Sequence, residues 1–148
     1  MRRRELLNLK LRDVDLSDMT LKVILGKGNR SRVVPLTAHV AEAIGEWLAV
    51  RPDSGHDVLF AGRDGRPMQA HGLNDAFRRA ADGAGVARPG VSLHTLRHSF
   101  ATMLLHSQVD LFSLQKLLGY ASIESAAIYL HVDMTRLRAA VASHPMAT

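Results

Sequence analysis

Two short stretches near the start of the chain predict strands: TLKVIL (20–25), in which polar and apolar residues alternate over 20–23, and SRVVPL (31–36). Alternation is typical of strands with one buried face. The Gly-rich sequence between them, GKGN (26–29), predicts a tight turn, so the two stretches are expected to form a β-hairpin. Residues 1–10 predict a helix whose leucines are partly buried, and residues 13–18 predict a polar turn.

After the hairpin, apolar residues recur every three or four positions, which is typical of amphipathic helices. Thr37 is a candidate N-cap for the first of them. Residues 51–69 are rich in Gly and Pro and predict a loop with a short strand at 58–60. The expected helices cover residues 38–50, 71–85, a stretch after Ser92 with Leu96, Phe100, Met103 and Leu104 on one face, 111–118 up to Gly119, 122–131 and 133–142. The pattern predicts a mainly α fold with a small antiparallel β-sheet (α+β), in a single domain.

The composition is that of a folded domain. Of the 148 residues, 47% are hydrophobic and 22% are charged, which is enough to bury a core without covalent staples. The absence of cysteine excludes disulfides and thiolate metal sites, and no apolar run approaches membrane-spanning length. We therefore expect a soluble cytoplasmic protein with no membrane partner.

The charge favours a phosphate-rich partner. The formal net charge is +5, and 15 of the 19 basic residues are arginine. A planar guanidinium group matches the oxygens of a phosphate. A GC-rich genome would give the same excess of arginine, so the composition leaves both explanations open.

The sequence HTLRH (94–98) is the first candidate for chemistry. On a helix, His94 and Arg97 share a face, and His98 lies nearby. A histidine beside an arginine can bind an anionic phosphate and move protons near pH 7. The same spacing also fits a solvated basic face, and a zinc site on His94 and His98 would need further ligands for which the sequence has no motif.

Tyr129, in IYLH (128–131), is the second candidate. A phenol, with a pKa of about 10, is a poor nucleophile at neutral pH. Cations around a bound phosphate can lower that pKa and stabilise charge in the transition state. Taken alone, Tyr129 also fits an aromatic residue at the boundary of the core.

Four separated segments together resemble the tyrosine recombinase, or phage-type integrase, family. HTLRHSFAT (94–102) closely resembles its signature, and LLG (117–119) is followed ten residues later by Tyr129 and then by His131. The opening MRRRELL resembles the first arginine box of the family, and GKGNR followed by VPL resembles its lysine-bearing turn. The segments occur in the family's order and span nearly the whole chain, so the combination is specific where each segment alone is weak.

The resemblance implies a role for each matched residue. Arg2 and Arg97 would clamp the scissile phosphate, His94 would transfer protons, and Lys27 would protonate the leaving 5′ oxygen. Tyr129 would attack the phosphate and hold DNA as a 3′-phosphotyrosine. Glu5, His98 and His131 would support the site. The hairpin arginines, Arg30 and Arg32, would contact DNA.

Tyr120 departs from the family pattern, which usually has His or Trp directly after Leu-Leu-Gly. A phenol can donate to a phosphate oxygen, and its ring can pack as an indole does. We interpret Tyr120 as a replacement catalytic donor, with a competing nucleophile as the alternative. Arginine and lysine supply the positive charge, so the resemblance implies neither a metal nor a cofactor.

The family normally carries an N-terminal helical domain that clamps DNA from the opposite side, and nothing in this sequence corresponds to it. A helix that opens at residue 1 without a cap leads us to expect an N-terminally truncated catalytic domain, residues 1–148, with weak or no recombination by itself. Double-stranded DNA is the expected partner, in the nucleoid. The helix from Met134 to Ala142 either docks on a neighbouring subunit, giving a homo-tetramer on DNA, or folds back on its own domain.

Three functions compete. The first is a DNA strand transferase, a site-specific recombinase or integrase. The second is a noncatalytic DNA-binding remnant, with residues 111–131 as a helix–turn–helix. The third is a type IB topoisomerase, against which the short length argues. The arginine box, the lysine turn and Tyr-x-His serve no purpose together in a pure binder, so we expect the strand transferase.

Overall fold

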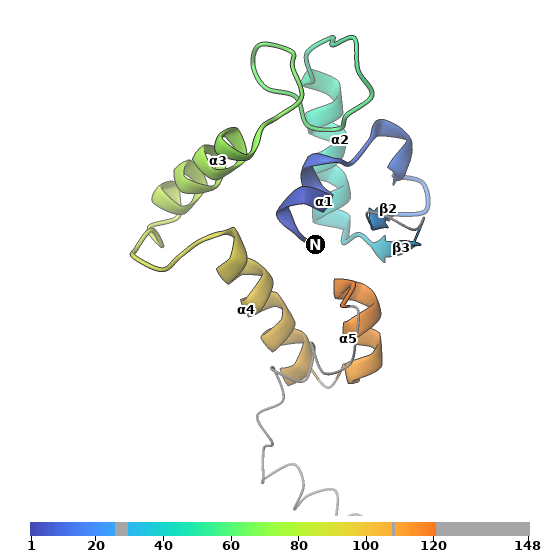
Figure 1. Cartoon of the computed structure of the whole chain (residues 1–148), viewed down its shortest axis with the longest axis vertical. Helices are drawn as coiled ribbons and strands as arrows, with labels where there is room; N and C mark the ends of the chain where they lie inside the picture. The colour runs from blue at the N-terminus through green and yellow to red at the C-terminus, as the bar shows by residue number, and fades with distance from the viewer. Residues whose placement is uncertain (26–29, 108, 121–148) are drawn as a thin grey trace, which may run out of the picture.

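A computed structural model describes residues 1–25, 30–107 and 109–120 of the chain. In this part of the chain, helices predominate and accompany one small antiparallel sheet (Figure 1). The sheet has the order β1-β2-β3, with strands Val14–Asp15, Thr20–Leu25 and Arg30–Pro35. The helices are α1 (Arg3–Leu7), the 3-10 helix η1 (Leu11–Asp13), α2 (Ala38–Val50), α3 (Ala70–Gly83), α4 (Leu93–His106) and α5 (Leu111–Leu118). The predicted fold class is confirmed.

The hairpin strands and α2 begin and end within one residue of their predicted bounds, and Thr37 caps α2 as predicted. The helix predicted over residues 1–10 is shorter, because Asn8 leaves helical geometry and Lys10 forms an isolated bridge with Val58. The turn predicted at 13–18 also contains β1, which the sequence pattern did not indicate. The helices predicted at 122–131 and 133–142 lie outside the described residues.

The register of the hairpin decides which side chains enter the core. Leu21 pairs with Val34, and Val23 pairs with Arg32. Residues that face each other across antiparallel strands lie on the same side of the sheet. Leu21 and Val23 are buried on that side. The side chain of Arg32 is therefore directed into the molecule with them.

The loop between α2 and α3 supplies the centre of the main core. Leu59 is fully buried there, its N–H donates to the Leu9 carbonyl (2.7 Å), and its carbonyl accepts from Trp47 Nε1 (2.9 Å). The short strand predicted at 58–60 was wrong. This segment pairs only through isolated bridges, such as Val58 with Lys10, because its neighbour is the irregular chain after α1.

A second apolar cluster joins α4 to α5. Its buried members are Ala101, Leu114 and Leu118, with Leu104, Leu105, Leu111 and Tyr120 packed around them. Asp110 caps α5 by accepting from the Ser113 N–H (2.9 Å), and Gly119 ends it in the left-handed conformation (φ 68°). Of the four apolar residues predicted on one face of α4, Leu104 joins this cluster, whereas Leu96, Phe100 and Met103 are about half exposed or more.

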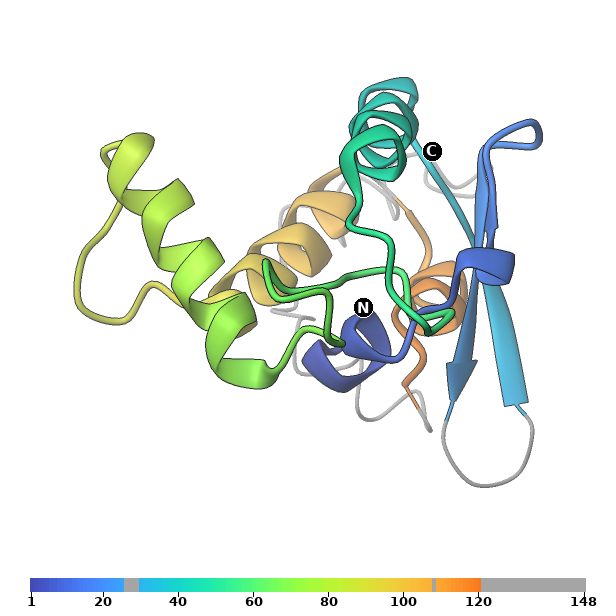
Figure 2. The same ribbon diagram turned by 90° about the horizontal axis from the view of Figure 1, so that it is seen from above.

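The helices and the sheet leave the N-terminus near the middle of the molecule. Figures 1 and 2 both place α3 at one end, the sheet at the other, and the first residues between them. The start of the chain consequently lies close to α4, about 90 residues further along. No helix of the described part is both long and apolar enough to cross a membrane.

Candidate functional site

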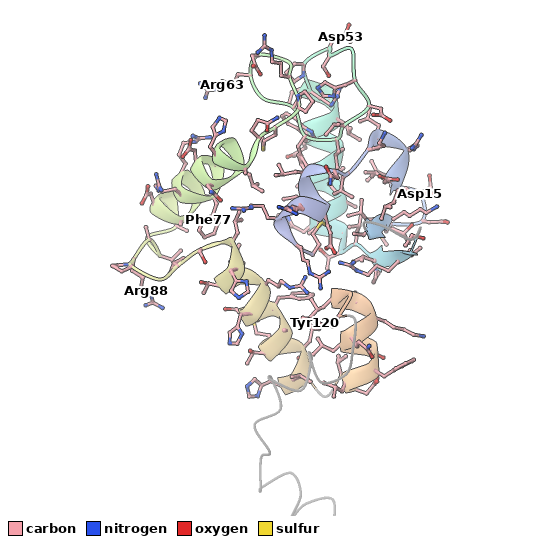
Figure 3. The ribbon with its side chains drawn as sticks, in the orientation of Figure 1. Asp15, Asp53, Arg63, Phe77, Arg88 and Tyr120 are labelled. Atoms are coloured by element: carbon pink, nitrogen blue, oxygen red, sulfur yellow. The ribbon has the colours of Figure 1, made fainter. Side chains whose placement is uncertain are left out.

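A cavity of about 1070 Å³ opens between the first residues of the chain, α3 and the N-terminal half of α4. Phe77 on α3, Arg88 after it and Tyr120 after α5, all labelled in Figure 3, line this pocket from different elements. Four residues predicted to be catalytic line it together, namely Arg2, His94, Arg97 and Tyr120. The tertiary structure thus gathers side chains that are up to 118 positions apart.

The start of α4 places two of these side chains. Ser92 and Thr95 form a reciprocal capping box, in which the Ser92 hydroxyl accepts from the Thr95 N–H (3.3 Å). This cap fixes the first helical turn, so His94 and Arg97 fall on one face, three residues apart. His94 is exposed to solvent and Arg97 is partly buried at the inner wall of the pocket.

The guanidinium group of Arg97 is held by the end of α5. Its Nη2 donates to the Leu118 carbonyl (2.9 Å), and its Cζ lies 4.9 Å from the centre of the Tyr120 ring. Its Nη1 is buried and has no hydrogen-bond partner within the described residues. A buried charged donor without a partner is costly. An anion in the pocket would satisfy it.

Arg2 is held by a carboxylate at the start of α1. Its backbone N–H donates to Glu5 Oε2 (2.6 Å), and its Nη1 lies 3.4 Å from Glu5 Oε1. The Arg2 side chain is still 48% exposed, whereas that of Glu5 is 7% exposed. Arg2 is therefore anchored at its base while its guanidinium group stays accessible in the pocket.

Arg32 has a different place from the one predicted. Its Nη1 and Nη2 donate to the two oxygens of Glu5 (3.1 and 2.8 Å), and its Nε donates to the Leu117 carbonyl (2.9 Å). Its side chain is only 9% exposed. The interpretation of Arg32 as a surface contact for DNA was wrong, because the hairpin register turns this side chain inward.

Opposing effects set the ionisation of Glu5. Burial by itself raises the pKa of a carboxyl group, but hydrogen bonds from Arg32 and from the Arg2 backbone, with the charges of both guanidinium groups, bring the pKa of Glu5 below its ordinary value. Burial, and after it the charges of Arg97 and Arg32, lower the pKa of the Met1 amino group. Glu5 is thus ionised at neutral pH beside a strongly positive pocket.

Three further arginines, to which the sequence motifs assigned no role, line the pocket, namely Arg3, Arg78 and Arg88. Among the described residues of the lining, Asp82 is the one carboxylate against five arginines. The helical spacing of Asn74, Phe77, Arg78, Ala81 and Asp82 was a signal for one shared face on α3. No local pattern indicated that this face would turn toward α4.

Of the other predicted site residues, one more lines the pocket and several lie outside the described residues. His98 lines the pocket beside His94. Lys27, Tyr129 and His131 lie outside the described residues, as does the side chain of Arg30. Within the residues that the structure describes, no group of three or more His, Cys, Asp or Glu side chains could hold a metal ion.

The geometry suits a tetrahedral oxyanion. The guanidinium groups of Arg2, which is half exposed, and of Arg97, at the inner wall, provide planar donors for phosphate oxygens. His94 adds an imidazole that can donate or accept a hydrogen bond in the same pocket. The donors are fixed before an anion arrives, which is the arrangement that stabilises charge developing during a reaction.

Comparisons with known proteins find a family and individual proteins to which this chain is similar. The model of the phage integrase family matches residues 1–136 of the chain. Tyrosine recombinase XerD of Halalkalibacterium halodurans is 39% identical over 153 residues, covering 99% of this chain and 50% of the relative. Tyrosine recombinase XerC of Xylella fastidiosa (strain 9a5c) is 40% identical over 144 residues, covering 97% of this chain and 48% of the relative.

A solved structure is also similar. The XerH site-specific recombinase bound to difH substrate, in a pre-cleavage complex, superposes with a TM-score of 0.81 at 35% identity. The match covers 97% of this chain and 42% of that one. The chain spans about half the length of the curated relatives it matches.

Proposed function

The chain belongs to the phage integrase family, and from this membership we propose that residues 1–148 form the catalytic domain of a site-specific tyrosine recombinase that cleaves and rejoins double-stranded DNA. The observation that carries the proposal is the convergence of Arg2, His94 and Arg97 on one basic pocket. The similar XerH structure is described as a complex with its substrate before cleavage, which supports a polynucleotide as the ligand.

The pocket suits phosphoryl transfer without a metal ion. Arg2 and Arg97 bind the nonbridging oxygens of the scissile phosphate, and the Arg97 Nη1 that has no partner among the described residues supplies one of these donors. Fixed guanidinium groups stabilise the charge that builds on those oxygens in the transition state. His94 assists proton transfer from the opening of the same pocket.

The covalent step is assigned to Tyr129. Its phenol oxygen loses its proton to His94 and bonds to phosphorus while the bond to the 5′ oxygen breaks, and Lys27 gives that leaving oxygen a proton. The strand stays attached through a 3′-phosphotyrosine. Attack by a 5′ hydroxyl reverses the step and rejoins the strand. Glu5 supports Arg2, and the Tyr120 ring supports Arg97. His98, in the pocket lining, and His131 are assigned supporting roles.

DNA affinity is assigned to the basic rim. Arg3, Arg78 and Arg88 surround the pocket and provide charge for neighbouring phosphates.

Assembly on DNA as a homo-tetramer is part of the proposal. Light scattering of the chain with and without duplex DNA tests it, and a complex that stays monomeric on DNA would contradict it.

The proposed reaction is tested with nicked duplexes of randomised sequence. A nick beside the cleavage site lets the short 5′ fragment escape, so the covalent protein–DNA adduct accumulates and survives denaturing electrophoresis. The wild-type chain is expected to form the adduct, and Tyr129→Phe is expected to bind DNA without forming it. Tyr120→Phe, the same change at the other tyrosine, is expected to form the adduct about 10²-fold more slowly rather than not at all, so the two tyrosines are distinguished.

The same assay separates the competing functions. Binding without adduct in the wild type would indicate a noncatalytic DNA-binding remnant. An adduct accompanied by relaxation of supercoiled DNA, without strand exchange between two sites, would indicate a topoisomerase. Sequencing of the trapped DNA identifies the target.

A further inference from the structure

Arg32 occupies an unusual position for a charged side chain. It lies on the inner face of the hairpin opposite Val23, its side chain is 9% exposed, and it is not part of the pocket lining. Burying a charged group is costly unless it is paired and hydrogen-bonded. Its contacts therefore show what it is buried for.

Those contacts join three elements that are distant in sequence. Two nitrogens of Arg32 bind both oxygens of Glu5 on α1, and the third nitrogen binds the Leu117 carbonyl in the last turn of α5. These partners lie 27 and 85 residues away. A guanidinium group is the one side chain with enough donors in a fixed plane to make all three bonds.

The backbone of Gly119, which has no side chain, leaves room for the guanidinium group of Arg32. Its φ of +68° is left-handed, and a Cβ added there would lie 2.5 Å from Arg32 Nη1. Any side chain at position 119 would thus meet the guanidinium group directly. The end of α5 is closed around Arg32 from two sides, by the Leu117 carbonyl and by the bare backbone of Gly119.

Both pocket arginines depend on the groups that Arg32 holds. Glu5, fixed by Arg32, accepts from the Arg2 backbone N–H (2.6 Å) and lies 3.4 Å from the Arg2 guanidinium group. The α5 end, fixed by Arg32 at Leu117, presents the next carbonyl, Leu118, to Arg97 (2.9 Å). One buried side chain is thus connected to two donors on opposite sides of the pocket.

We propose that Arg32 is a positioning residue that sets Arg2 and Arg97 at the spacing required for one phosphate, acting through Glu5 and through the carbonyl end of α5. The inference rests on the proposed function for its catalytic consequence. Lysine cannot replace Arg32, because a single ammonium group cannot span two carboxylate oxygens and a carbonyl at once. A displacement of either pocket arginine by about 1 Å is enough to slow the reaction by about 10²-fold.

The test compares Arg32→Lys with Arg12→Lys, the same change at an exposed arginine outside the pocket. Adduct formation from a nicked substrate is measured in a single turnover, with DNA affinity and thermal unfolding measured in parallel. Arg32→Lys is expected to lower the cleavage rate by about 10²-fold while DNA affinity stays close to that of the wild type. Arg12→Lys is expected to match the wild type in all three measurements.

A second readout does not depend on activity. Nitrogen-15 spectra of the guanidinium groups report the surroundings of each arginine directly. In Arg32→Lys, the signals of Arg2 and Arg97 are expected to shift, whereas that of Arg63, in the exposed loop after Ala61, stays in place. Wild-type cleavage in Arg32→Lys with unmoved Arg2 and Arg97 signals would overturn the inference.

Two further outcomes are distinguishable. If the wild type forms no adduct, the proposed function fails, and the spectra alone decide the positioning role. If Arg32→Lys is unfolded at the assay temperature, Glu5→Gln is used, since it keeps the shape of the residue while weakening the pairing with Arg32. A Glu5→Gln protein that is folded, cleaves at the wild-type rate and leaves the Arg2 signal unmoved would equally overturn the inference.

Discussion

At the residue scale, the two pocket arginines differ in how they are held. Arg97 is fixed by a main-chain carbonyl and lies over the Tyr120 ring, while Arg2 is fixed by the carboxylate of Glu5. Neither arrangement uses up the guanidinium donors, because Arg97 keeps Nη1 without a partner among the described residues and Arg2 stays accessible. Fixed donors with spare capacity are what binding a phosphate requires.

The hydroxyl group of Tyr120 is expected to contribute to cleavage. If its hydroxyl donates to the phosphate, Tyr120→Phe keeps the ring under Arg97 but lowers the single-turnover cleavage rate by about 10²-fold. Tyr120→His restores a donor and is expected to cleave at least as fast as the wild type. A slow Tyr120→His protein with unchanged DNA affinity would refute the role as donor.

At the scale of single elements, the ends of helices place the site. Ser92 fixes the start of α4 and with it His94 and Arg97, and the left-handed Gly119 ends α5 where its carbonyls meet the arginines. The first turn of α1 adds Glu5 beneath Arg2. Caps and turn residues, which are short-range features, therefore determine which side chains reach the pocket.

Gly119→Ala is expected to destabilise the protein. A non-glycine residue in the left-handed region costs roughly 1–2 kcal/mol, and the new Cβ also displaces Arg32. Gly83→Ala, at the end of α3 where a Cβ meets nothing within 4 Å, is the matched control and gains stability by a few tenths to about 1 kcal/mol. Urea unfolding of both variants checks this, and equal midpoints would contradict it.

The buried Glu5 predicts an acid-sensitive site. The pKa of Glu5 is lower in the folded chain than the ordinary 4.5, so on acidification the unfolded chain takes up a proton at a higher pH than the folded chain does. The stability that Glu5 contributes is therefore present above pH 4.5 and is lost as the pH falls through the folded pKa. Urea unfolding between pH 6 and pH 3 measures this loss. Glu5→Gln is expected to be less stable at pH 7 and to lose less on acidification; parallel curves for the two proteins would exclude this cause.

At the scale of the whole molecule, the pocket forms where the chain's start, α3 and α4 meet. Five arginines from these elements surround it, with Asp82 as the one carboxylate in the described lining. Such a concentration of one charge attracts a polyanion and releases its counterions on binding. The concentration of arginines around one cavity is therefore more informative about the partner than the net charge of +5.

Arg88, in the pocket lining, is expected to contact a DNA phosphate. Replacing it with Gln removes one phosphate contact, so DNA binding weakens for all sequences alike and the slope of log affinity against log salt falls by about 1. Fluorescence anisotropy over a salt series measures that slope. Arg63→Gln, in the loop after Ala61 and outside the pocket, keeps the wild-type slope; a change equal to that of Arg88→Gln would show that overall charge alone is responsible.

The local pattern determined much of this protein. Alternation in the first strand and the Gly-rich turn predicted the hairpin, apolar spacing and Thr37 predicted α2, and Gly119 predicted the end of α5, because each of these signals acts over a few residues. The motif spacing also led to the family and to five residues that share the pocket. The roles assigned to those five residues remain predictions, and so do the roles of Lys27 and Tyr129, which lie outside the described residues.

Tertiary structure alone decided the rest. The inward turn of Arg32 needs a carboxylate 27 residues away and a carbonyl 85 residues away to offset its desolvation, and no local pattern records such partners. Leu59, which enters the core from a loop, and Arg78, which α3 brings to the pocket, likewise depend on contacts between segments that are far apart in sequence. The periodicity of the sequence determines on which face of a helix or strand a side chain lies. Which side chains line the pocket depends on which of these faces pack together in the folded chain.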